Sequence, residues 1–260
     1  MTINLYTGPM KSGKTKLHLT YLLNVTRDAF DYNGFKTPVF RFQSKFDKYG
    51  KREEFIQAHD SNDKPDAIVV ERSEQIWDEV MRRKPALVTI DKAHFADERL
   101  IQLFEALKRE GYNVNAEAVF SNFRGDPFPL ASSYSDDFSD KTVGDLVAKA
   151  DCHISCVAKC TCIVYGSDNN GRCGKPANQT QRKLDGLPAH YDTPIIISTG
   201  KGGAGEYEGK HVTYNPVCDE HLEVPGKPKS PFVEGKPSKP SGEEIRENES
   251  RRGGLEEVPF

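Results

Sequence analysis

Residues 8–15 read Gly-Pro-Met-Lys-Ser-Gly-Lys-Thr, and this stretch decides the fold. It matches the pattern G-x-x-x-x-G-K-[ST], with a β-like run, residues 3–7, before it and a helical pattern, residues 14–30, after it. Backbone N–H groups of such a loop surround phosphate oxygens, and the helix N-terminus adds positive potential. We expect Lys14 to reach the β- and γ-phosphates and the Thr15 hydroxyl to bind Mg²⁺. The stretch therefore predicts a protein that binds a nucleoside triphosphate.

Strand-like and helical patterns alternate after this loop. Runs typical of strands cover residues 37–42, 67–70, 86–90 and 116–120, and amphipathic helical patterns cover residues 74–83 and 98–110. Strands separated by helices favour a parallel sheet, because each helix returns the chain to the same end of the sheet. We expect an α/β fold in which a mostly parallel nucleotide-binding sheet has helices on both faces.

Asp91 directly follows the apolar run of residues 86–90. Open α/β sheets bind their ligands at the carboxyl ends of the strands, so a carboxylate at this point is well placed to hold the magnesium ion of a bound nucleotide. The alternative is a surface aspartate in a turn. We predict that Asp91 is a Mg²⁺ ligand.

The composition of the chain changes after Val224. Residues 225–260 are rich in Pro, Gly, Lys and Glu and have almost nothing to bury, so we expect a disordered tail. Residues 151–224 hold the cysteines and many glycines, which suggests a small metal-binding subdomain. The predicted organisation is a nucleotide-binding domain, 1–150, a subdomain, 151–224, and a tail, 225–260.

The charge balance argues against several classes of protein. The chain has 260 residues with Lys+Arg 36 and Asp+Glu 39, a net charge of −3, which gives no basic field for nucleic acid or an anionic membrane. No apolar run approaches the roughly 20 residues of a membrane helix. The first residues lack the features of a secretory signal. We expect a cytoplasmic protein with no membrane or nucleic-acid partner.

Six cysteines in a cytoplasmic protein are more typical of metal ligands or free thiols than of disulfides. Five of them lie between Cys152 and Cys173, and Cys218 is followed by His221 at the local spacing of a zinc ligand pair. The cysteines therefore indicate a zinc site, the alternative being unmetallated buried thiols.

The motifs together resemble one family, the type II thymidine kinases, which are the zinc-containing cellular and bacterial kind. The resemblance covers about residues 1–224 and rests on GPMKSGKT at 8–15, DKAHF at 91–95, FRGDPF at 123–128, CGKPANQTQR at 173–182 and YNPVCDEH at 214–221. It implies transfer of the γ-phosphate of ATP to the 5′-hydroxyl of thymidine, with Mg²⁺, in an enzyme that usually forms homotetramers.

The resemblance also implies roles for individual residues. A lasso loop, here about residues 192–214, would close over the base. The ATP phosphates would lie at Gly8, Ser12, Gly13, Lys14 and Thr15, Mg²⁺ at Thr15 and Asp91, and thymidine against Met10, Phe95, Val119, Phe123, Phe128 and Tyr214. The alternative for each of these apolar and aromatic side chains is ordinary core packing.

The family's structural zinc ion is held by a C-x-x-C pair and a second pair that matches Cys218 and His221. Cys173 matches the second cysteine of the first pair, but the first cysteine is not two residues earlier. Alignment without gaps from residue 150 places Cys160 there, with Cys162 as the alternative. Cys152 and Cys156 are expected in the core.

The sequence departs from the family at Lys92. The family has Asp-Glu where this chain has Asp91-Lys92, and that glutamate is the general base. A lysine with the usual pKa of about 10.4 is charged at neutral pH and cannot accept the proton. The leading hypothesis remains an ATP-dependent thymidine kinase. The alternatives are a catalytically weak nucleotide-binding homologue and a helicase-like ATPase, since DKAH resembles a D-E-A-H box.

Overall fold

The computed structural model describes residues 1–18, 20–21, 39–42, 67–164, 171–197 and 205–229. The chain divides into two units, Met1–Pro225 and Gly226–Phe260, and the account below concerns the first. Most of the predicted tail lies outside the described residues. So do parts of the helix predicted over 14–30, of the strand predicted over 37–42 and of the predicted lasso loop.

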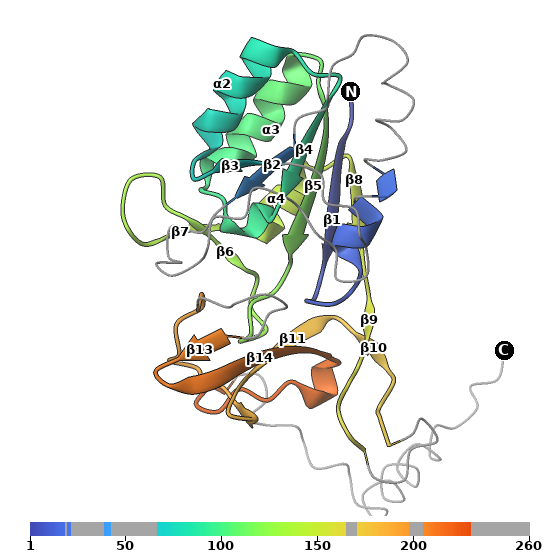
Figure 1. Ribbon diagram of the computed structural model, residues 1–260, viewed down its shortest axis with the longest axis vertical. Coiled ribbons are helices and arrows are strands. Elements are labelled where there is room, and N and C mark those ends of the chain that lie inside the picture. Colours follow the sequence, from blue (N-terminus) through green and yellow to red (C-terminus); the bar gives the residue numbers. More distant parts are fainter. Residues whose placement is uncertain (19, 22–38, 43–66, 165–170, 198–204, 230–260) are drawn as a thin grey trace, which may run out of the picture. The chain divides into compact units, whose positions relative to one another are not determined.

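The main sheet has six strands in the order β3-β2-β4-β5-β1-β8, and every neighbouring pair is parallel (Figure 1). This confirms the mostly parallel sheet expected from the sequence. The strands are β1 (Ile3–Gly8), β2 (Val39–Phe42), β3 (Ile68–Val70), β4 (Leu87–Asp91), β5 (Asn113–Val119) and β8 (Cys152–Ser155). Because β8 pairs with β1, the sheet continues past residue 150, whereas the division into domains stays a prediction.

Helices lie on both sides of this sheet, as expected. In Figure 1, α2 (Ser73–Arg83) and α3 (Arg99–Arg109) lie to the left of the strands, and the helical residues 14–18 and 20–21 lie to the right. A third helix, α4 (Val143–Lys149), contacts α3. The helices α2, α3 and α4 each bury apolar residues: in α3, the buried residues Leu100, Leu103, Phe104 and Leu107 recur at the three- and four-residue spacing of one helix face.

The two faces of the sheet differ in polarity. Successive side chains of a strand point to opposite faces. On β5, Val114, Ala116 and Ala118 belong to the apolar core, whereas Asn115 and Glu117, which alternate with them, are polar and equally buried. A buried polar side chain costs free energy unless it has a partner. The polar face of β5 is therefore where a functional role is most expected.

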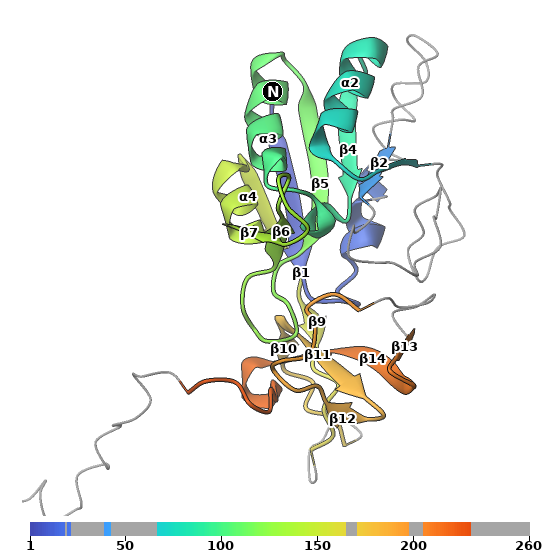
Figure 2. The ribbon, with the colours of Figure 1, turned by 90° about the vertical axis from the view of Figure 1, so that its left-hand side faces the viewer.

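A second group of strands is antiparallel (Figure 2). It forms a four-stranded sheet in the order β12-β11-β14-β13. Its members are β11 (Gln179–Leu184), β12 (Leu187–Pro188), β13 (Gly205–Tyr207) and β14 (Lys210–Val217). Two small ladders accompany it, β9 (Ala158–Lys159) with β10 (Pro176–Ala177) and β6 (Pro129–Ala131) with β7 (Phe138–Thr142). Short 3-10 turns, η1 (Ala93–Phe95) and η3 (Asp219–His221), follow β4 and β14.

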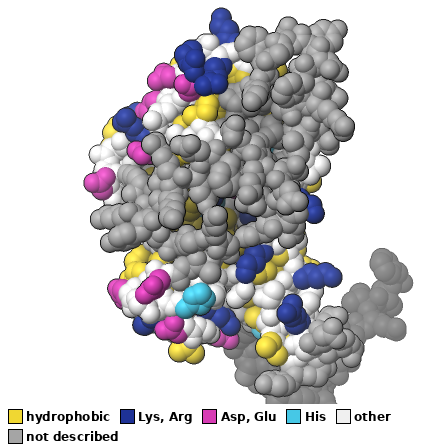
Figure 3. All heavy atoms as spheres, in the orientation of Figure 1, with side chains coloured by type: hydrophobic (Ala, Val, Ile, Leu, Met, Phe, Trp, Pro, Cys, Tyr) yellow, Lys and Arg dark blue, Asp and Glu magenta, His cyan; other side chains and the backbone are white. Residues whose placement is uncertain are grey.

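Two properties of the described residues bear on partners. Lys and Arg side chains and Asp and Glu side chains both occur on the face in Figure 3, in line with the small net charge of −3. Within the described residues, no helix is long and apolar enough to cross a membrane.

Candidate functional site

The loop at residues 8–15 begins where β1 ends and depends on its glycines. Gly8 has φ 147°, and a Cβ added there would lie 2.1 Å from the carbonyl oxygen of Cys156. Gly13 has φ 82°, again in the region that favours glycine. The backbone directly after β8 thus runs against the start of the loop, and only glycine fits at position 8.

Polar groups of the loop are available to an anion. The buried Lys14 directs its Nζ back over the loop and donates to the carbonyl of Pro9 at 2.9 Å. Ser12 Oγ is a buried atom that has no hydrogen-bond partner among the described residues. Thr15 lies in the first turn of the helix that follows. A cation and an unpartnered hydroxyl at a helix N-terminus fit a phosphate group.

Asp91, at the end of β4, lies beside a second carboxylate that sequence reasoning missed. The pairing of β4 with β5 runs through Thr89 with Asn115 and Ile90 with Ala116, so the next position along brings Asp91 beside Glu117. Both side chains are buried, with exposed fractions of 2% and 3%, and their carboxyl groups are hydrogen-bonded to each other. Arg41 on β2 approaches Asp91 with 3.7 Å between Nε and Oδ2.

The pKa values of the two carboxyl groups are shifted in opposite directions. Burial, followed by the nearby charge of Glu117, raises the pKa of Asp91 to about 7. Burial also opposes ionisation of Glu117, but the charge of Lys14 and further cationic and hydrogen-bonding neighbours lower the pKa of Glu117 to about 2. Two like charges this close disfavour joint ionisation, so a cation placed between them would favour the doubly ionised form.

Lys92 begins the turn that follows. It has the left-handed backbone conformation, φ 56°, and its N–H donates to Glu117 Oε1 at 3.1 Å. His94, in the same turn, accepts the N–H of Val119 through Nδ1 at 3.1 Å, and burial lowers the pKa of His94 to about 3. The turn after β4 is thus fastened to β5 at two points, and its histidine is neutral.

Two other acidic residues near Lys92 in the sequence are engaged elsewhere. Asp97 accepts the backbone N–H groups of Ser73 and Arg99. Glu98 accepts the N–H and the hydroxyl of Ser133. Both carboxylates therefore hold segments that are distant in the sequence, at Ser73 and at Ser133.

The residues predicted to line the nucleoside pocket fall into two groups. Phe95 and Phe128 pack edge-to-face, with 6.0 Å between ring centroids, and Val119 packs against the same core. Tyr214 belongs to a second cluster, against which Met10 packs. Phe123 and Tyr214 are joined by a cation, since the guanidinium carbon of Arg182 lies 4.0 Å and 5.2 Å from their ring centroids.

Arg182 and Arg124 are candidate site residues that the sequence analysis did not single out. Arg182, on β11, is buried and donates to the carbonyls of Pro194 and Ile195. Arg124 donates to the carbonyl of Thr193 at 3.0 Å. The two side chains hold the backbone of residues 193–195, the beginning of the predicted lasso. Arg182 ends the CGKPANQTQR motif and Arg124 lies within FRGDPF. Their positions in these two motifs are the sequence feature that could have identified them as candidates.

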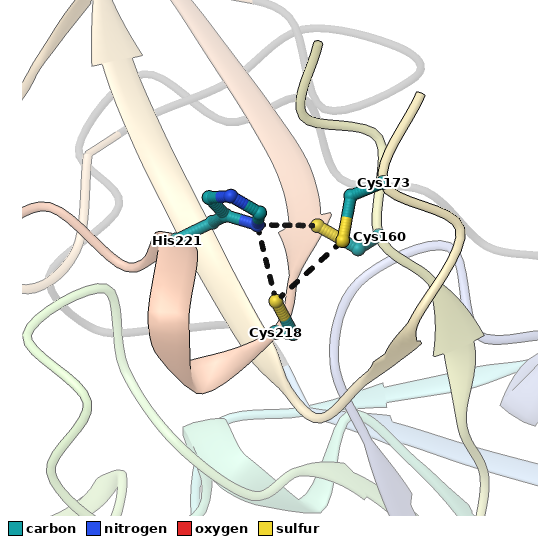
Figure 4. Close-up of side chains that lie close together, drawn as sticks. All are labelled: Cys160, Cys173, Cys218 and His221. Carbon is teal, nitrogen blue, oxygen red and sulfur yellow. Dashed lines mark hydrogen bonds between the residues drawn. The ribbon is translucent and has the colours of Figure 1, made fainter. Parts of the chain in front are cut away.

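Four side chains form a group that fits a metal ion (Figure 4). The ligand atoms of Cys160, Cys173, Cys218 and His221 all lie within 4.8 Å of one another. Cys218 Sγ is 3.2 Å from His221 Nδ1 and 4.0 Å from Cys173 Sγ. Sulfur atoms bound to one tetrahedral zinc ion, at about 2.3 Å each, are about 3.8 Å apart. The donor set and its spacing suit a closed zinc site.

The other cysteines lie outside this group. Of the two alternatives for the first ligand, the structure brings Cys160 into the group and leaves Cys162 beside it. Although burial opposes ionisation of Cys160, backbone N–H donors and contacts with His221 and Cys218 lower its pKa to about 6. The expectation that Cys152 and Cys156 lie in the core was wrong: Cys152 is exposed because β8 is an edge strand, and Cys156, which follows β8, is half-buried.

The loop after β1, the parallel sheet and the acidic residue at the end of β4 define a class, the P-loop nucleotide-binding proteins. Within that class, the model of the family described as thymidine kinase matches residues 1–222, and the chain belongs to this family. The family expected from the sequence motifs is thereby confirmed.

Individual relatives agree with this result. The chain is 28% identical over 228 residues to a thymidine kinase of Thermococcus kodakarensis. The matched residues make up 86% of this chain and 94% of the relative. It is 26% identical over 221 residues to a thymidine kinase of Mycoplasmoides gallisepticum, covering 85% and 80%. A thymidine kinase of Ureaplasma parvum is 28% identical over 231 residues, covering 87% and 84%.

Proposed function

We propose that this protein is an ATP-dependent thymidine kinase that transfers the γ-phosphate of ATP to the 5′-hydroxyl of thymidine. The observation that carries the proposal is a P-loop after β1 and Asp91 at the end of β4, both in a chain that the thymidine kinase family covers from residue 1 to residue 222. The match to the thymidine kinase family over residues 1–222 supports the kinase over the helicase-like ATPase and over the weak nucleotide-binding homologue that Lys92 suggests.

The phosphate end of ATP would bind at Gly8, Ser12, Gly13, Lys14 and Thr15. The carbonyl-bound Lys14 Nζ would transfer its hydrogen bonds to phosphate oxygens, and the unpartnered Ser12 Oγ would gain an acceptor. Thr15 and Asp91 would hold Mg²⁺, which when bound neutralises charge on the phosphates. The residues near the reacting atoms therefore act by positioning and electrostatics.

The nucleoside would bind against Met10, Phe95, Val119, Phe123, Phe128 and Tyr214. Aromatic and apolar walls with a few polar anchors are the usual lining of such a pocket. The hydrogen bonds from Arg182 and Arg124 to residues 193–195 support this role, because they present backbone groups of the lasso next to the aromatic side chains.

Position 92 is the unusual feature of the proposed site. General-base catalysis contributes roughly 10²–10⁴-fold to enzymatic rates. Lys92 supplies no base there, so we expect catalysis to depend on how the chain orients the 5′-hydroxyl and on the charges of Lys14 and Asp91.

Three further properties belong to the proposal. The group of Cys160, Cys173, Cys218 and His221 would hold a structural zinc ion. The active form would be a homotetramer, as the family resemblance implies. A cytoplasmic location would supply ATP and keep the six cysteines reduced.

Incubation with labelled ATP and thymidine tests the central statement. Wild-type protein should form thymidine monophosphate in a Mg²⁺-dependent reaction. The Lys14→Met variant should lose most of this activity, while the Lys16→Met variant, which alters an exposed lysine of the same helix, should retain it. If wild-type protein phosphorylates no pyrimidine nucleoside, the proposed function is wrong.

A further inference from the structure

Glu117 is a buried carboxylate to which the motifs assign no role. It lies in the middle of the sheet on β5, between β4 with Asp91 and β1 with the phosphate loop. With only 3% of its surface exposed, Glu117 loses almost all hydration. Burial of a carboxylate is costly unless charged or hydrogen-bonding partners compensate for it, so its presence calls for a physical reason.

The strand register places Glu117 at the nucleotide end of the sheet. Its partner on β1 is Tyr6, two residues before Gly8, and its neighbour on β4 is Asp91. The Tyr6 ring stacks on the ring of His18, with 5.8 Å between centroids, and His18 belongs to the helix that starts at the loop. Glu117 therefore faces the same side of the sheet as the loop helix, on a level with Asp91.

The charges around Glu117 converge from three elements. Lys14 of the loop attracts its carboxylate, Asp91 of β4 is hydrogen-bonded to it, and the Lys92 backbone donates to it. When ATP binds, Lys14 is needed at the phosphates. Arg41 stays beside Asp91 and offsets one of the two carboxylate charges, and the Mg²⁺ that accompanies ATP would offset the other.

We propose that Glu117 is a second carboxylate of the Mg²⁺–nucleotide site, provided from β5 beside Asp91. Mg²⁺ in nucleotide sites is bound by one or two carboxylates together with phosphates and water, directly or through that water. This inference rests on the proposed function for its metal. It explains how a chain with a lysine after Asp91 keeps two carboxylates at the end of the sheet.

A purely structural role is the competing explanation. Glu117 holds the Lys92 N–H and hence the turn that carries Phe95, and a glutamine oxygen at position 117 retains an acceptor for that bond. Glu117→Gln therefore removes the charge and leaves most of the hydrogen bonding, which separates the two explanations.

The test is a titration of Mn²⁺, followed by electron paramagnetic resonance, into the full chain saturated with a non-hydrolysable ATP analogue. The variants are Glu117→Gln, Glu117→Asp and, as a matched control, Glu98→Gln, whose carboxylate also accepts backbone and side-chain hydrogen bonds but lies on Ser133. The affinity of each protein for the metal-free ATP analogue is measured in parallel, with a chelator present. Because thymidine is absent, this titration measures metal binding alone. Its result is therefore independent of whether the protein phosphorylates thymidine in the kinase assay.

We expect Glu117→Gln to weaken Mn²⁺ binding roughly 10- to 100-fold, with metal-free analogue affinity unchanged. Glu117→Asp should recover part of the loss, and Glu98→Gln should bind Mn²⁺ like the wild type. An unchanged Mn²⁺ affinity in Glu117→Gln overturns the inference, and so does an equal loss of metal-free analogue binding.

A second measurement needs no variant. Anomalous diffraction from Mn²⁺ in the wild-type complex with the analogue should locate the ion about 2.1 Å from a Glu117 oxygen, or one water molecule away. An ion ligated at Asp91 and separated from Glu117 by more than one water molecule refutes the proposed role even if Glu117→Gln does not fold.

Discussion

The guanidinium of Arg182 lies over the ring of Phe123, with its central carbon 4.0 Å from the ring centroid. The same guanidinium donates to the carbonyls of Pro194 and Ile195. One buried side chain therefore connects β11, the FRGDPF segment and the start of the lasso. Arginine suits this role because its planar, fixed array of donors can stack on a ring and bind two carbonyls at once.

Arg182→Met should loosen this connection. The substitution keeps apolar bulk but leaves two carbonyls without their donor, so we expect a loss of about 2–4 kcal/mol in the free energy of unfolding and a higher KM for thymidine. Urea unfolding and steady-state kinetics measure both effects. Lys183→Met, on the next residue of the same strand, is the control and should change neither quantity by much. Equal behaviour of the two variants would contradict the role of Arg182.

Gly8→Ala should be far more damaging than Gly186→Ala. Both glycines have positive φ, 147° and 83°, but a Cβ at position 8 meets the Cys156 carbonyl at 2.1 Å, whereas at position 186 it meets nothing within 4 Å. Backbone strain alone costs about 1–3 kcal/mol, and the clash adds to it at position 8. Urea unfolding and ATP-binding measurements should rank the variants in this order. A Gly8→Ala protein with normal stability and ATP affinity is incompatible with the structure.

Cys173→Ser should release the metal. We expect about one zinc ion per wild-type chain, and well under one per Cys173→Ser chain together with a lower Tm, because the metal stabilises only the folded state. Cys162→Ser is the matched control, since Cys162 lies beside the group of four but outside it. Elemental analysis decides the point: if Cys162→Ser loses zinc and Cys160→Ser keeps it, the assignment of the first ligand is reversed.

Lys92→Glu should rescue a protein that lacks Glu117. Glu117→Gln is expected to weaken Mn²⁺ binding to the analogue complex roughly 10- to 100-fold, and adding Lys92→Glu places a carboxylate next to Asp91 in the sequence and should restore most of the affinity. The Lys92→Gln/Glu117→Gln protein removes the same lysine without adding a carboxylate and should still bind Mn²⁺ weakly. If both double variants recover equally, removal of the lysine charge explains the rescue and the second-carboxylate inference loses this support.

Local patterns were enough for the main elements and much of the site. The run from β1 through the loop into its helix was recognisable because phosphate binding requires particular residue types at fixed, short spacing. The buried strand before Asp91, the amphipathic helices α2 and α3 and the Cys218–His221 pair were recognisable for the same reason. Their chemistry lies within a few neighbouring residues, where sequence alone determines geometry.

Only the tertiary structure decided the rest, because the deciding contacts join residues distant in sequence. Nothing near Glu117 in the sequence marks it, and the parallel register of β4 with β5 brings it beside Asp91. Packing of β9 and β10 against β14 selects Cys160 over Cys162. The residues that form the phosphate loop are consecutive, so the sequence alone identifies them. The positions of Glu117 beside Asp91 and of Cys160 in the metal group depend on which strands are neighbours, and spacing along the chain does not determine that.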